Sequence, residues 1–170
     1  YENAIRLDPH DWQFRVAIAE AVFFQERWQD VISTCEKLDA MGYSDDDTQK
    51  MLAVAYAELD IQDPKAMEHY RAAVDNGTDN PAIHEAYCRD IYRRAPDSVE
   101  AQEQFTRALR KLPEAENYWA KLGTIRHQFK RNETDEALEK LASLLTDYPD
   151  IQDGFELAGE VISKDQRRSL

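Results

Sequence analysis

Apolar residues recur along this chain in two interleaved series with a period close to 35 residues. In the first series, an apolar or small residue is followed by two more, four and then seven positions later. Its four sets are Val31, Cys35 and Leu38; Ala66, Tyr70 and Ala73; Ala101, Phe105 and Ala108; and Ala137, Leu141 and Leu144. The sets begin 35, 35 and 36 residues apart. Side chains at this spacing share one face of an α-helix, so each set predicts an amphipathic helix.

The second series lies in the segments between those sets. Each member is a larger residue followed at once by a small one, with a third position three residues further on. The members are Ile18, Ala19 and Val22; Leu52, Ala53 and Tyr56; Tyr87, Cys88 and Ile91; Leu122, Gly123 and Arg126; and Ala158, Gly159 and Ile162. Gly123 stands inside a helical pattern, where glycine costs about 1 kcal/mol relative to alanine. We therefore expect a partner helix to cross closest at the small residue of each segment, where a larger side chain would overpack the contact.

Two interleaved series at one period predict a chain of helix pairs. Short amphipathic helices are marginal alone, so neighbouring pairs must stack to bury a continuous core. We predict a single array over residues 1–170, with four complete repeats at 12–43, 46–78, 81–113 and 116–149. Residues 1–8 would be the second helix of an incomplete repeat, and 151–163 an additional or capping helix. Asp11, Ser44 and Asn80 are the expected helix starts. The opening YENAIRLDP reads as the middle of a helix, as in a piece of a longer polypeptide.

The residues that carry the period also carry a resemblance. WAKLG followed by ALEKLASLLTDYP resembles the tetratricopeptide repeat (TPR), and WQDVISTCEKL and AMEHYRAAV resemble its second helix. The resemblance covers nearly the whole chain and implies an all-α, right-handed superhelical solenoid of antiparallel helix pairs. Arg126 departs from the pattern, because an aromatic residue usually follows Gly123 at that distance.

Charge narrows the choice of partners. The chain carries a formal net charge of −13, which would repel phosphate and argues against nucleic acid. A basic or neutral protein is electrostatically easier to approach. No run reaches the roughly 20 apolar residues of a membrane span. Cys35 and Cys88 lie in apolar helical patterns and read as buried thiols. They favour the cytoplasm, with the periplasm as the alternative, and the sequence leaves localisation unknown.

No motif for catalysis is found in the sequence. The four histidines form no H-E-x-x-H pattern, and neither a phosphate-binding loop nor a G-x-S-x-G elbow occurs. The acidic run Asp45–Asp47 lacks the spacing of a calcium loop. We therefore predict no enzyme activity, no metal and no cofactor.

The resemblance to TPR proteins points to the first helix of each repeat as the lining of a concave binding groove. Carried over by helical phase, the predicted partner-binding residues are Glu20, Phe23, Lys50, Arg89, Tyr92, Arg93 and His127. Arg89, Tyr92 and Arg93 lie one turn apart and are of types enriched at binding hot spots. The alternative is that the arginines pair with the surplus acids and that Phe23 packs on the next repeat. At least one of Phe23 and Phe24 should be exposed.

One TPR subclass clamps the C-terminal carboxylate of chaperone tails with lysines and asparagines on its first helices. Val16, Glu20 and Val54 stand at corresponding positions here and break that pattern, although Lys50 fits it. The leading hypothesis is therefore a non-catalytic scaffold that binds a peptide or helix of a partner protein in its groove. The alternative is an accessory segment of a larger bacterial secretion, envelope-assembly or glycan-handling protein. Self-association through exposed terminal helices is a third expectation.

Overall fold

The computed structural model describes residues 12–61 and 63–168, and the side chains among them up to residue 164. The helix expected over residues 1–8 and the helix start expected at Asp11 lie outside the described residues. By their contacts the residues form two units, Tyr1–Asp90 (unit 1) and Ile91–Leu170 (unit 2). Each unit is described by itself.

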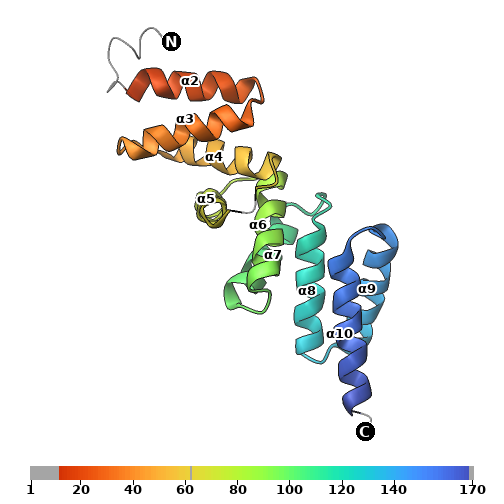
Figure 1. The fold of residues 1–170 in the computed structure, drawn as a ribbon. Helices are drawn as coiled ribbons and strands as arrows, with labels where there is room; N and C mark the ends of the chain where they lie inside the picture. Colours follow the sequence, from red (N-terminus) through yellow and green to blue (C-terminus); the bar gives the residue numbers. More distant parts are fainter. Residues whose placement is uncertain (1–11, 62, 169–170) are drawn as a thin grey trace. The chain divides into compact units, whose positions relative to one another are not determined.

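Unit 1 is built from α2 (Trp12–Phe24), α3 (Trp28–Ala40), α4 (Asp46–Glu58), α5 (Pro64–Asp75) and residues 81–90 of α6 (Pro81–Arg94). Helix α2 packs on α3 and α4, α3 packs on α4, and α4 packs on α5. Figure 1 shows α2, α3 and α4 as neighbouring layers. Each helix from α2 to α4 therefore packs on the one that follows it, and α2 and α4, the first helices of two successive pairs, also touch.

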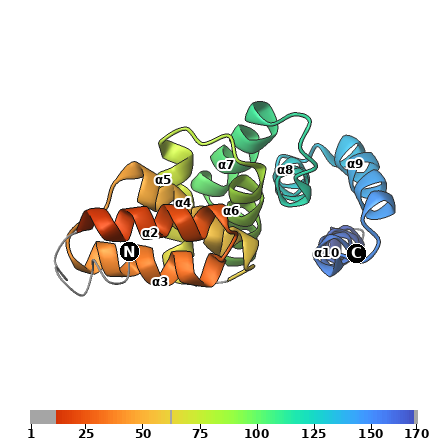
Figure 2. The same cartoon turned by 90° about the horizontal axis from the view of Figure 1, so that it is seen from above.

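Unit 2 continues with the end of α6, then α7 (Val99–Lys111), α8 (Tyr118–Lys130), α9 (Thr134–Asp147) and α10 (Gln152–Arg168). Helix α7 packs on α8, α8 packs on α9, and α10 packs on both α9 and α8. Figure 2 shows α8, α9 and α10 from a second direction. All regular elements over the described residues are helices, so the predicted all-α class is confirmed.

Side-chain caps explain where several helices begin. The Asp45 side chain accepts from the Thr48 backbone N–H, and the Thr48 hydroxyl accepts from the Asp45 N–H, which makes a capping box at the start of α4. The Ser98 and Asn117 side chains cap α7 and α8 by accepting from the backbone N–H of Ala101 and Ala120, without the reciprocal bond of a capping box. Losing such a cap typically costs about 0.5–2 kcal/mol. Asn80 accepts from the Ala82 N–H and was predicted correctly, whereas the cap of α4 is Asp45, one residue after the predicted Ser44.

The first apolar series forms the core of both units. All of its members on α3, α5, α7 and α9 are buried, and none is more than 3% exposed. Two of the four sets are built around one aromatic residue, Tyr70 in α5 and Phe105 in α7. The second helix of each pair is therefore anchored as its spacing predicts.

The close approach predicted at Gly123 is confirmed. A Cβ atom built on Gly123 in α8 would overlap the aromatic ring of Phe105 in α7. Ala19, Ala53 and Cys88, at the same place in α2, α4 and α6, are fully buried.

The same prediction is wrong for α10. Gly159 is exposed, and a Cβ atom there would meet nothing within 4 Å. Ile162, which the series places on the packing face, is 56% exposed. Helix α10 instead packs through Gly154 and Leu157, and a Cβ atom on Gly154 would lie 2.6 Å from the Tyr118 hydroxyl and 2.8 Å from Leu145 Cδ2. A different face of α10 is therefore buried from the one that the repeat pattern indicates.

Candidate functional site

The described residues hold no group of three or more histidine, cysteine or acidic side chains that could bind a metal ion. Cys35 and Cys88 are buried free thiols. Burial, with a smaller contribution from the Asp45 charge, raises the pKa of Cys35 to about 12, so this thiol is a poor nucleophile at neutral pH. Within the described part of the chain, no helix is long and apolar enough to cross a membrane.

In unit 1, three of the predicted groove residues lie at or near the surface. Glu20 is exposed at the solvent face of α2. Phe23 is half-buried and meets Trp28 edge to face, with ring centroids 5.5 Å apart. Phe24 beside it is 85% exposed, which confirms that one of the two phenylalanines faces solvent. Lys50 on α4 is half-exposed, 4.0 Å from the Asp47 carboxylate in the same helix.

Arg89, the fourth predicted residue of unit 1, is engaged in internal ion pairs. Its side chain is 13% exposed and pairs with Asp60 and with Asp90, the latter at 3.1 Å from Nε to Oδ1. Asp90 itself is buried. The carboxylates of Asp60 and Asp90 therefore already neutralise the guanidinium.

In unit 2, Tyr92 and Arg93 converge on one aromatic side chain, Trp119 of α8. The Tyr92 ring lies 5.8 Å from the Trp119 ring and 6.3 Å from the Phe105 ring, centroid to centroid. Tyr92 is buried, and this burial raises its pKa to about 12. The Arg93 guanidinium lies over the Trp119 ring at 4.8 Å and pairs with Asp153 at 3.6 Å, with its side chain 40% exposed. Of these two, Arg93 is the one that solvent reaches.

His127 belongs to the core of unit 2. It is 8% exposed, and its ring lies 6.1 Å from the Phe105 ring that fills the space beside Gly123. Burial lowers its pKa below the usual value and outweighs the opposing effects of the Pro96 backbone hydrogen bond and the Asp97 charge. His127 and Tyr92 therefore both lie against Phe105 in the core of unit 2, and neither faces a groove.

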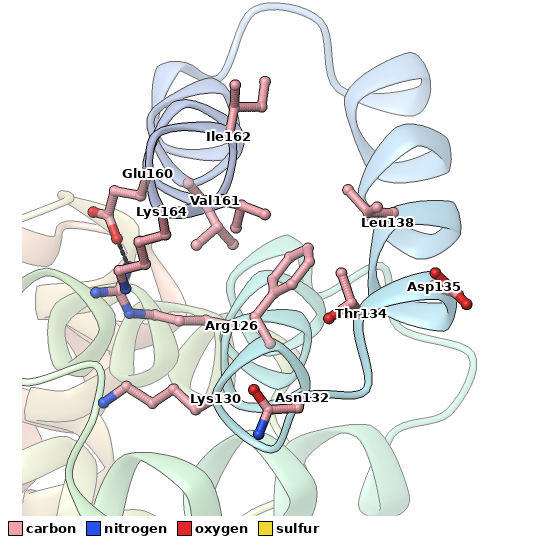
Figure 3. Close-up of a pocket in the computed structure, with 12 residues that line it drawn as sticks. Arg126, Lys130, Asn132, Thr134, Asp135, Leu138, Glu160, Val161, Ile162 and Lys164 are labelled. Atoms are coloured by element: carbon pink, nitrogen blue, oxygen red, sulfur yellow. Dashed lines mark hydrogen bonds and ion pairs between the residues drawn. The ribbon is translucent and has the colours of Figure 1, made fainter. Parts of the chain in front are cut away.

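A cleft that the sequence did not indicate opens in unit 2 between α8, α9 and α10. Its volume is about 630 Å³. Figure 3 shows α10 and α9 as opposite walls, with Val161 and Ile162 on one and Leu138 on the other. Phe129 and Leu157 complete the apolar lining. Ile162 and Leu138 are 56% and 44% exposed, so large apolar surface faces solvent at this opening. We call it the α8–α10 cleft.

The charged residues of the α8–α10 cleft are unevenly distributed. Arg126, Lys130 and Lys164 lie along the α8 and α10 side, and Asp135 lies on α9 (Figure 3). Arg126 joins two elements, since it pairs with Asp97 at 3.0 Å and with Glu160 of α10 at 3.1 Å.

The Asp97 carboxylate, which Arg126 shares with Lys130, is held in its charged form. Lys130 pairs with Asp97 at 2.9 Å. Burial alone would raise the pKa of Asp97, but the hydrogen bonds and charges of Arg126 and Lys130 together hold this pKa below its usual value. Ion pairs among Arg126, Lys130, Asp97 and Glu160 therefore hold the α8 and α10 side of the cleft in place.

Two sequence signals pointed toward this region without identifying it. Arg126 stood out because it replaces an expected aromatic residue, and its place in the structure is a bridge from α8 to α10. Leu138 follows Ala137 and so lies off the buried face of α9, where an apolar side chain has no core to join. Neither signal reveals a cleft, because its second wall depends on how α10 packs.

Comparison with known proteins supports the fold. A search of solved structures finds the crystal structure of YrrB, described as a TPR protein with an unusual peptide-binding site. The match has a TM-score of 0.60 and 18% sequence identity, and it covers 94% of this chain and 80% of that chain. No protein-family model and no curated protein sequence matches the chain. The chain therefore has the TPR-like fold, an all-α solenoid of helix pairs, at a level of identity that speaks for the fold alone.

Proposed function

We propose that this chain is a non-catalytic protein-interaction scaffold that binds a peptide or a helix of a partner protein. The observation that carries the proposal is the TPR-like fold, in which first helices of the repeats bury one face and still expose side chains such as Glu20 on α2 and Arg93 on α6. YrrB, which shares the fold, is described as having a peptide-binding site.

The contacts we propose are the predicted groove residues that solvent reaches. In unit 1 these are Glu20 and Phe23 on α2 and Lys50 on α4, two helices that touch each other. In unit 2 the contact is Arg93, which Trp119 and Asp153 hold in place. Cations of this kind suit carboxylates on a bound peptide, because charge-assisted hydrogen bonds are the stronger ones.

The proposal is tested by selecting binders from a displayed random-peptide library against the wild-type chain. The selected peptides are then measured against Lys50→Ala and Arg93→Ala by fluorescence anisotropy. Lys37→Ala and Arg110→Ala are the matched controls, because they remove exposed cations from the second helices α3 and α7. We expect a loss of affinity of about tenfold for at least one groove variant, as for a hot-spot residue, and none for the controls.

Two results would contradict this function. One is a library that yields no peptide binding the wild type above background. The other is a set of peptides whose affinities are reduced equally by the groove variants and the controls. The predicted alternative, an accessory segment of a larger secretion, envelope-assembly or glycan-handling protein, stays a prediction that the sequence on either side of these residues would test.

A further inference from the structure

We propose that the α8–α10 cleft is a second docking site, for one amphipathic α-helix of another protein. The helix would insert apolar side chains between Leu138 and Ile162 and carry carboxylates along the edge that faces Lys164. The inference rests on the proposed function as a protein-interaction scaffold, but it uses residues that the predicted groove does not include.

The apolar lining determines the kind of side chain that enters. Phe129, Leu157 and Val161 form the interior, and Leu138 and Ile162 stand at the opening with about half of their surface in solvent. Covering such side chains is favourable at roughly 25 cal/mol per Å² of apolar surface removed from water. A volume of about 630 Å³ accommodates the side chains of one helix face. Recognition by an apolar face laid into a groove is a recurrent mode for amphipathic helices.

The repeat itself supports a missing apolar contact at this place. Between α7 and α8, the Phe105 ring fills the space beside Gly123. In α10, the equivalent Gly159 is exposed and does not line the cleft, whereas Ile162 of the same pattern does line it and is 56% exposed. This junction is therefore more open than the one before it, and a bulky apolar side chain from outside can occupy it.

The charges that line the cleft determine which charged residues the incoming helix should carry along its edge. The chain as a whole carries −13, yet the residues lining the cleft are three cations and two anions, Arg126, Lys130, Lys164, Asp135 and Glu160. Arg126 is already paired with Glu160 and Asp97, and Lys130 is already paired with Asp97. Lys164 has no ion pair among the described residues, so it is available to a carboxylate of the incoming helix.

The same charge argues against a second copy of this chain as the occupant. Two molecules with a net charge of −13 each repel one another as they approach. A helix from a neutral or basic protein, with carboxylates restricted to one edge, avoids that repulsion and still complements Lys164.

The experiment uses a fluorescently labelled synthetic amphipathic peptide with leucines along one face and glutamates along one edge. One companion peptide has lysines in place of the glutamates, and another has the same composition with the leucines scattered. Binding of each to the wild-type chain is measured by fluorescence anisotropy. We expect the glutamate-edged peptide to bind more tightly than both companions.

The chain variants are Ile162→Glu, Leu138→Glu and Lys164→Glu, all at exposed positions where folding should persist. Val99→Glu is the matched control, because Val99 is an exposed apolar residue on α7, 74% accessible, that does not line the cleft. We expect Ile162→Glu and Leu138→Glu to weaken binding about tenfold or more, as for a lost apolar anchor, and Lys164→Glu to weaken only the glutamate-edged peptide. Val99→Glu should bind as the wild type does.

Four outcomes would overturn the proposal. The glutamate-edged peptide could fail to bind, or bind Ile162→Glu and Val99→Glu equally well. The lysine-edged peptide could bind more tightly. Light scattering could show a concentration-dependent dimer that Ile162→Glu abolishes, which would make a second copy the occupant. Library-selected peptides that need Lys50 or Arg93 but not Ile162 would leave the scaffold function intact and refute only this site.

Discussion

The ring of Phe105 in α7 occupies the volume that a side chain on Gly123 in α8 would need. Phe105 is fully buried and also lies against Tyr92 and His127, so it has little room to move. A glycine that weakens its own helix is therefore required by the packing of its neighbour.

Gly123→Ala should destabilise the chain although alanine is the better helix former. The added Cβ overlaps a ring that cannot shift freely, and overpacking of this kind costs about 1–3 kcal/mol. Gly159→Ala is the matched control, because that glycine meets nothing within 4 Å and the change should add about 0.4–1 kcal/mol of stability. Urea denaturation of both variants measures the difference. Equal stabilities of Gly123→Ala and Gly159→Ala would contradict the close approach of Phe105 to Gly123. Glu139→Gln, a surface change on α9, serves as a second control and should leave stability unaltered.

Arg126→Leu should loosen the attachment of α10 to α8. The variant loses the ion pairs to Asp97 and Glu160, and partly exposed pairs of this type contribute about 1 kcal/mol or less. Hydrogen exchange in α10 should become faster relative to that in α3, which lies in unit 1. An unchanged exchange rate in α10 would show that apolar contacts alone hold this helix.

The pKa of Asp97 gives a test in acid. Its folded-state pKa is held below the usual value, so the stability it contributes is fully present above about pH 4, the pKa of an ordinary aspartate. That contribution is lost as the pH falls through the folded-state pKa. NMR titration of the Asp97 carboxyl group should show a lowered pKa in the wild type and a higher one in Arg126→Leu. The same pKa in both proteins would contradict the role given to Arg126.

His127 should make the chain less stable in mild acid. Burial lowers its folded-state pKa, so below about pH 6.5 the unfolded chain takes up a proton more readily than the folded one. Stability is therefore complete above that pH and decreases as the pH falls toward the folded-state pKa. His69 shifts in the same direction, also through burial. In His127→Gln, denaturant midpoints measured from pH 7 to pH 5 should fall less than in the wild type.

Cys35 should resist alkylation in the folded chain. A thiol with a pKa of about 12 is almost entirely protonated at pH 8, and Cys35 and Cys88 are both inaccessible. Iodoacetamide followed by mass spectrometry should label neither cysteine in buffer and both in denaturant. Rapid labelling of Cys35 in buffer would show that α3 opens readily.

The sequence by itself determined the helices and the residues that anchor α3, α5, α7 and α9, the second helix of each predicted pair. It could do so because the 3.6-residue period fixes which side chains share a face, and because one pattern repeats about every 35 residues. Val31, Tyr70, Phe105 and Leu141 are all buried as their spacing predicts. The need for a small residue at Gly123 could also be read from the sequence.

Only the tertiary structure decided what covers each first helix. Helical phase places Tyr92 and His127 on a face, but the neighbouring ring of Phe105 makes that face part of the interior. The repeat pattern also places Gly159 and Ile162 on the packing face of α10. In the structure α10 instead buries Gly154 and Leu157, and the α8–α10 cleft stays open beside it. Periodicity specifies the face of a helix, and the way residues far apart in the sequence pack specifies what that face meets.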